Sequence, residues 1–295
     1  MNKINIIILS LFTGILICIP LRADQSSGSQ LMPPPVSVMN WHKGMTALDV
    51  EGFYMTMTPK LDVPGAMKIS GAGALFNYNS SASEHFGFNL NGSVIGMTGT
   101  SEDTYSQNNL YTTLLNINPN LVWTPINGEV KDIAGEITKN GFSWGIFAGV
   151  GMMFMNLDTQ QVIMMANTTR TPAGMTMSMT SIDYGTLMEI PLSWWISIEP
   201  SYTITQFISG SVTFGGQTIS IDASNLPAQS IYGTDILIRP LKLNPNLRIS
   251  LGALAGAIAA NSDSSDYSST MIMLGIQYEW GKHYSSSFVS PGFTR

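Results

Sequence analysis

Charged residues are scarce in this 295-residue chain: they make up 11% of it, against 44% hydrophobic residues. Soluble domains usually carry about 25% charged residues, so an ordinary soluble surface is not expected. The 13 basic and 19 acidic residues give a net charge of −6 without any basic run, so we expect no nucleic-acid partner. High apolar content combined with a small net charge also excludes a disordered chain.

Cysteine is almost absent, since Cys18 is the only one, and a disulfide-stabilised scaffold is therefore excluded. Histidine is rare as well: His42, His85 and His283 stand far apart, and none is placed with a serine and an acid. Neither a Cys/His metal spacing nor a glycine-rich phosphate loop before a helix occurs. We therefore expect no enzyme activity and no cofactor.

A cleaved secretory signal peptide is predicted at residues 1–23. Lys3 supplies positive charge before the apolar run from Ile6 to Ile19, and Ala23 precedes the predicted cleavage site. This run is shorter than the roughly 20 apolar residues that a transmembrane helix needs. Residues 24–45 are polar and proline-rich, which indicates a flexible linker.

Long alternating runs dominate the rest of the sequence. In 86–97 and 144–155, large apolar residues alternate with small or polar ones, which indicates β-strands. Runs of this length match the ~9–11 residues with which a tilted strand crosses a bilayer. The predicted strands are 46–57, 68–79, 85–97, 109–124, 141–156, 182–193, 196–207, 231–241, 246–258 and 269–280.

These strands predict an all-β fold, an antiparallel transmembrane β-barrel of about ten strands over residues 46–280, because lipid requires a sheet without free edges. Prolines inside several runs leave eight or twelve strands open, and a soluble β-sandwich is the disfavoured alternative. Residues 281–295 form a C-terminal tail that either hangs free or plugs the lumen. Extracellular loops are expected at 98–108, 157–181, 208–230 and 259–268, and short periplasmic turns at 80–84, 194–195 and 242–245.

Charged residues of the predicted strands are expected to face the lumen, because Arg on the lipid face costs about 2–4 kcal/mol. We expect Arg239 and Arg248 to pair with Glu199 and Glu189. Eight strands leave a lumen just filled by side chains, so such pairs would close a ten-stranded barrel or nearly so. A narrow cation-preferring pore is the alternative, since inward acids outnumber inward bases. The predicted lumen charges are Asp49, Glu51, Glu189, Glu199, Arg239, Arg248 and Glu279.

Methionine is unusually frequent, with 19 residues. Met175, Met177 and Met179 alternate with Thr and Ser, so in a strand their thioethers share one face. Thioethers select Cu(I), which makes these three residues candidate Cu(I) ligands. The favoured interpretation is that methionine fills apolar space as a flexible side chain, and no metal site is predicted.

The last predicted strand ends on Gly275, Tyr278 and Trp280. A glycine followed by two spaced aromatic residues resembles the C-terminal signature of Gram-negative outer-membrane β-barrels. This resemblance implies an outer-membrane location, contact with outer-membrane lipid and recognition by the barrel assembly machinery. The sequence departs from the signature at Met273, where a polar residue is usual, and in the 15 residues that follow Trp280.

The hairpin at 190–202 carries a second resemblance. Its pattern, Ile-Pro-Leu, a turn and then I-x-I-x-P-S-Y, resembles MetA-type outer-membrane proteins of phenol-degradation clusters.

Two functions are expected for the chain as a whole. The first is a narrow passage or binding barrel for small solutes; the second is a structural or surface-interaction barrel with a filled lumen and extracellular loops as contact sites.

Overall fold

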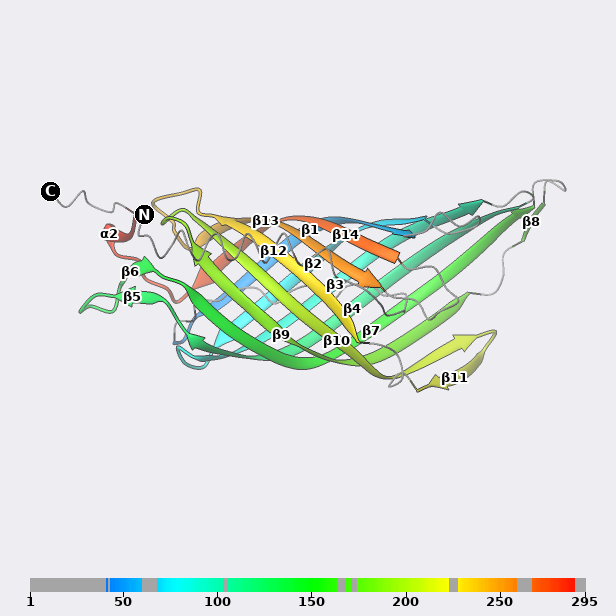
Figure 1. Cartoon of the computed structure of the whole chain (residues 1–295), viewed down its shortest axis with the longest axis horizontal. Coiled ribbons are helices and arrows are strands. Elements are labelled where there is room, and N and C mark those ends of the chain that lie inside the picture. Colours follow the sequence, from blue (N-terminus) through cyan, green and yellow to red (C-terminus); the bar gives the residue numbers. More distant parts are fainter. Residues whose placement is uncertain are drawn as a thin grey trace.

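The computed structural model describes residues 41, 43–59, 68–102, 106–163, 168–170, 174–222, 228–258 and 267–289. The predicted signal peptide and most of the predicted linker lie outside these residues. Ten strands form a closed antiparallel β-barrel (Figure 1), which confirms the predicted fold and strand number. They are β1 (Thr46–Pro59), β2 (Lys68–Ser81), β3 (Phe86–Glu102), β4 (Ser106–Ile126), β7 (Ser143–Ile163), β9 (Met175–Pro191), β10 (Ile196–Phe214), β12 (Gln229–Ile238), β13 (Leu247–Ile258) and β14 (Tyr267–Trp280).

The barrel closes where β1 pairs with β14, in a continuous register from Thr46 opposite Trp280 to Pro59 opposite Tyr267. Every other neighbouring pair in the wall is also antiparallel. Backbone groups inside the wall therefore have partners on both sides, as a strand in lipid requires.

The two ends of the barrel differ. At one end, here called the turn end, the connections are 82–85, 127–142, 192–195 and 239–246. This end also holds β5 (Glu129–Lys131), β6 (Ile137–Asn140) and the short helix α2 (Ser286–Val289), whereas β8 (Thr168–Arg170) and β11 (Gln217–Ile221) lie toward the other end, the loop end (Figure 1).

Three of the predicted extracellular loops are largely strand, including 98–108, where β3 continues to Glu102 and β4 begins at Ser106. Strands β4 and β7 are 21 residues long, and β9 begins at Met175, where Met175 pairs with Leu157. On the other side, β10 continues to Phe214. The loop predictions for 98–108, 157–181 and 208–230 are corrected accordingly. Polar residues there continue the hydrogen-bonded ladder beyond the length needed to cross a bilayer, and their polarity alone made them look like loops.

The outer face of the wall is apolar and exposed. Val94, Leu121 and Leu274 lie on it with much of their surface uncovered. Aromatic rings gather on it near the turn end, where Phe86 stacks on Trp123 and Tyr278 meets the edge of Trp280. An apolar band bordered by aromatic residues is the surface of a transmembrane barrel. Separately, no helix in the described ranges has the length and apolar character to span a membrane.

Glycines on the inner face make room for bulky side chains of neighbouring elements. A Cβ on Gly87 would clash with the ring of Trp41, and a Cβ on Gly185 would clash with the ring of Phe147. Both rings are buried and pack with Met45, Val122 and Leu187 in one cluster. Trp41 and Met45, at the end of the predicted linker, are therefore part of the packed interior.

Candidate functional site

The inner face of the barrel changes in character from the turn end to the loop end. Along β14 the order of inward side chains is Glu279, Gln277, Met273 and Met271, and all four are buried. Elsewhere in the wall these side chains lie on different strands: buried asparagines on β2, β3 and β4, further buried carboxylates on β1, β9, β10 and β12, and buried apolar side chains toward the loop end of every strand. The lumen therefore has a charged floor, a polar middle and an apolar upper half.

The floor is organised around Arg248, whose side chain is completely buried. Its guanidinium reaches Glu279 at 3.0 Å, Glu189 at 3.5 Å and Glu199 at 3.6 Å. The three acids come from β14, β9 and β10, so one arginine on β13 ties four strands together. The expected contacts of Arg248 with Glu189 and Glu199 are present, and Glu279 is a third partner.

The predicted ion pair of Arg239 is wrong. Arg239 forms no ion pair with a carboxylate of the described residues. It donates instead to the backbone oxygens of Pro245 and Trp194, and its guanidinium lies over the rings of Tyr284 and Phe288. The reason is position: Arg239 follows the last residue of β12, so it leaves the wall and meets the C-terminal tail.

The tail closes the turn end together with the β5–β6 hairpin. The amide of Ile137 donates to His283, and the amide of Ser285 donates to Ile137. Phe288 and Ile137 are both buried. We call the hairpin and residues 282–289 the cap. Backbone hydrogen bonds hold its two parts together, and the described part of the tail, residues 281–289, lies at the turn end of the barrel.

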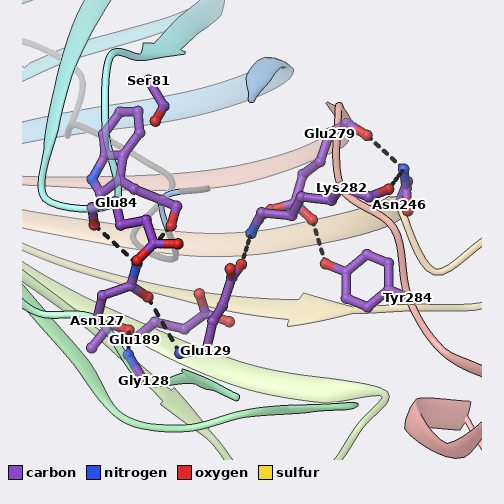
Figure 2. A network of polar contacts seen from close by, with 12 residues as sticks. Ser81, Glu84, Asn127, Gly128, Glu129, Glu189, Asn246, Glu279, Lys282 and Tyr284 are labelled. Atoms are coloured by element: carbon purple, nitrogen blue, oxygen red, sulfur yellow. Dashed lines mark hydrogen bonds and ion pairs between the residues drawn. The ribbon is translucent and has the colours of Figure 1, made fainter. Parts of the chain in front are cut away.

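Ionic contacts join the cap to the wall (Figure 2). Lys282 is buried, with its Nζ 2.9 Å from Glu129 of the hairpin and 3.2 Å from Glu279 of β14. Tyr284 donates a hydrogen bond of 2.9 Å to the other oxygen of Glu279. Burial disfavours the charged form of Lys282, but the Glu129 and Glu279 carboxylates outweigh it and raise the pKa of Lys282. Burial and then the charge of Glu279 also raise the pKa of Tyr284.

Amide side chains fill the middle of the lumen. Asn120 donates to Asn89 at 3.1 Å, and Asn89 donates to Asn79 at 2.9 Å, so one chain of bonds crosses β4, β3 and β2. We call this set the amide layer. Its buried members are Asn77, Asn79, Asn89, Asn91, Asn116, Asn118, Asn120 and Gln277.

Further buried carboxylates flank the amide layer. Asp49 receives a long contact from Asn77, and Asp183 accepts from Ser181. Glu51 lies against Gly275, and Asp235 lies against Gly252, where a Cβ would clash with them. Asp183 and Asp235 are not among the predicted lumen charges, although their even spacing from Glu189 and Arg239 places them on the same face.

Apolar side chains line the loop-end half of the lumen. They form one cluster to which all ten wall strands contribute. Seven of its buried members are methionines, and two more methionines pack against it. We call these nine residues the thioether layer: Met55, Met57, Met97, Met153, Met155, Met177, Met179, Met271 and Met273.

The methionines named from the sequence are partly in this layer. Met177 and Met179 belong to it, while Met175 lies one step nearer the loop end and is half-buried. All three are in strand β9. Among the described residues there is no group of three or more His, Cys, Asp or Glu side chains that could hold a metal ion.

The residues of the C-terminal signature lie on opposite faces of β14. Gly275 faces the lumen against Glu51, whereas Trp280 lies exposed on the outer face and contacts the half-exposed Tyr278, with ring centroids 4.8 Å apart. Recognition by assembly machinery stays a prediction.

No protein-family model matches the sequence, and no curated protein matches it. Among solved structures, the fold is similar to the β domain of the Bordetella autotransporter BrkA, at 10% identity and a TM-score of 0.44, covering 79% of this chain and 98% of that one. It is also similar to the translocator domain of NalP from Neisseria meningitidis, at 9% identity and a TM-score of 0.42, covering 80% and 89%. A third is the outer-membrane protein OprG from Pseudomonas aeruginosa, at 8% identity and a TM-score of 0.35, covering 82% and 99%. The resemblance to phenol-degradation proteins stays a prediction.

Proposed function

We propose that this chain is an outer-membrane barrel that binds small cationic solutes in its lumen and passes them when its cap moves. The supporting observation is the charge of the lumen. Within the described residues, seven buried carboxylates face it, whereas Arg239, Arg248 and Lys282 are its buried cations. The carboxylates are Asp49, Glu51, Asp183, Glu189, Glu199, Asp235 and Glu279. An excess of buried acid is relieved by a bound cation.

The turn end, with its short connections, is assigned to the periplasm, and the loop end to the cell exterior. On this assignment the cap is periplasmic. It is built from a hairpin and a tail that are not part of the wall, so it can move without breaking the strand ladder. The outer-membrane lipid and the barrel assembly machinery are the partners that we propose for the outer face and for β14.

Ion flux through refolded protein in lipid vesicles tests this function. Only protein whose gel mobility shifts on boiling is used, so that the barrel is known to be formed. We expect little flux from the closed wild type and K⁺-over-Cl⁻ flux once Lys282→Met loosens the cap. The double variant Glu51→Gln with Asp235→Asn should lower that cation preference. Folded barrels that carry no ions with or without the cap substitution would contradict the passage.

A surface-interaction barrel is the second candidate, and one observation favours it. Strand β11 is exposed, carries no charge and pairs only with β10 in the described structure. Unprotected edge strands of this kind pair readily with another chain. Ile219→Lys would place a charge on this edge. If flux is absent and Ile219→Lys abolishes binding of whole cells to a protein-coated surface, the second function is the better one.

A further inference from the structure

Methionines that are far apart in the sequence lie close together in the barrel. The nine residues of the thioether layer come from β1, β3, β7, β9 and β14, and the chain has 19 methionines in all. We infer that this layer is a binding site for a soft monovalent cation, with Cu(I) as the natural choice. This inference rests on the proposed function in that it names a ligand class for the same lumen.

Several thioethers stand directly opposite one another. On the inner face of β7 and β9, Met153 pairs with Met179 and Met155 pairs with Met177. Opposite residues of antiparallel strands have Cβ atoms about 4.5–5.5 Å apart. Methionine has three rotatable side-chain bonds and a polarisable sulfur, so two or more sulfurs of this group of four can turn to one ion.

A further pair spans the closure of the barrel. Met55 on β1 stands opposite Met271 on β14, and both are buried. Thioether ligands select Cu(I) over the hard cations that prefer oxygen. The layer therefore provides soft ligands on two parts of the wall.

A cation in an apolar space also needs a counter-charge, because burying an unpaired charge is costly. Asp235 supplies one beside the layer. Its Oδ1 atom and the terminal carbon of Met273 both lie against the Cα of Gly252, where a Cβ would meet each of them. Asp235 is 7% exposed, and its Oδ1 makes no hydrogen bond to a described residue. This carboxylate oxygen is thus buried, unpartnered and adjacent to a thioether.

Simple space-filling makes a different prediction from metal binding. If methionine only fills apolar volume, leucine is an adequate substitute, since such swaps usually cost less than about 1.5 kcal/mol. If the sulfur binds an ion, leucine abolishes binding and leaves the barrel folded. Met152 provides a matched control: it neighbours Met153 on the same strand but lies 40% exposed on the outer face.

The test uses the refolded barrel in detergent with Cu(I) held under anaerobic, reducing conditions. Cu(I) is partitioned between the protein and a chromogenic chelator, and Ag(I) is measured in parallel. We expect wild type and Met152→Leu to retain Cu(I) equally. The double variant Met153→Leu with Met179→Leu should bind Cu(I) at least about tenfold more weakly than wild type. Asp235→Asn should also lower the affinity for Cu(I). X-ray absorption at the copper edge should show sulfur neighbours in wild type.

Two results would overturn the proposed Cu(I) site. No Cu(I) retention by wild type, or unchanged retention by the Met153/Met179 double variant, overturns the site. Fold is checked by the mobility shift on boiling, and Met155→Leu with Met177→Leu is a second pair if the first fails to fold. K⁺ flux separates this inference from the proposed function: flux without Cu(I) binding removes only the site, and Cu(I) binding without flux removes only the passage.

Discussion

Arg248 holds together acids that would otherwise repel one another. Its three carboxylate partners come from three different strands, and none is exposed by more than a few per cent. Buried ion pairs are costly to form, but removing one partner is more costly still, because the remaining charge has no compensation. Stability at the turn end therefore depends on this one side chain more than on any single carboxylate.

Arg248→Met is expected to lower the free energy of unfolding by about 3–5 kcal/mol. Arg239→Met is the matched control. Arg239 contacts backbone oxygens and rings, so its loss breaks no described ion pair and should lower the free energy of unfolding by less. Urea titration of the gel mobility shift in detergent measures both. Equal stability losses in the two variants would show that the Arg248 contacts carry no special weight.

Strand alternation predicts which way most charged residues point. The inward placement of Glu189, Glu199 and Arg248 follows from it, since charge is excluded from the lipid face. The contacts of Arg239 do not follow, because the residue lies past the end of its strand, where alternation no longer fixes direction. Its ring partners, Tyr284 and Phe288, come from the tail, whose sequence shows no alternation of apolar and polar residues from which their positions could be predicted.

Strand elements could be predicted well where a tight turn ends them. Predicted and observed boundaries agree within a few residues at the turn end, for example at Ser81 and Ile196. At the loop end the predicted strands are too short for β3, β7, β9 and β10, where polar residues continue the ladder. The β5–β6 hairpin escaped prediction because strands of 3 and 4 residues are too short to show a period, and because its stability depends on the tail.

The cap should loosen in alkali. Lys282 and Tyr284 both have raised pKa values in the closed cap, so the closed form binds their protons more tightly than the open form. Its stability is therefore complete below about pH 10, where free Tyr and Lys keep their protons, and falls as the pH rises further.

Tyrosinate absorbance measures this effect. The difference between wild type and Tyr284→Phe isolates the titration of Tyr284 from that of the other tyrosines. In the folded protein this difference should appear at higher pH than in the urea-unfolded chain. If the folded and unfolded difference curves coincide, Tyr284 is not buried against Glu279 and the cap contact is wrong.

The molecule as a whole presents an apolar outer band between two polar ends. Leu274 lies near the middle of β14 on this band and is exposed, six residues before Trp280. Ile133 is fully exposed too, but lies in the turn between β5 and β6. In a bilayer the first is surrounded by hydrocarbon and the second by water.

An arginine at each position distinguishes these surroundings. Leu274→Arg should cost about 2–4 kcal/mol of folding free energy in lipid vesicles, whereas Ile133→Arg should cost close to nothing. Reversible urea unfolding in vesicles measures the difference. Similar small costs for both would mean that lipid does not surround β14.

The tail can dock only on a finished barrel. Its binding place combines Glu129 from the hairpin, Arg239 from the end of β12 and Glu279 from β14, and these three meet only after β14 has taken its place in the wall. Residues 282–289 also follow every strand in the order of synthesis. A slip of β14 by one residue would turn Glu279 to the outer face and remove this binding place. Docking of residues 282–289 therefore depends on a wall whose strands are all in register.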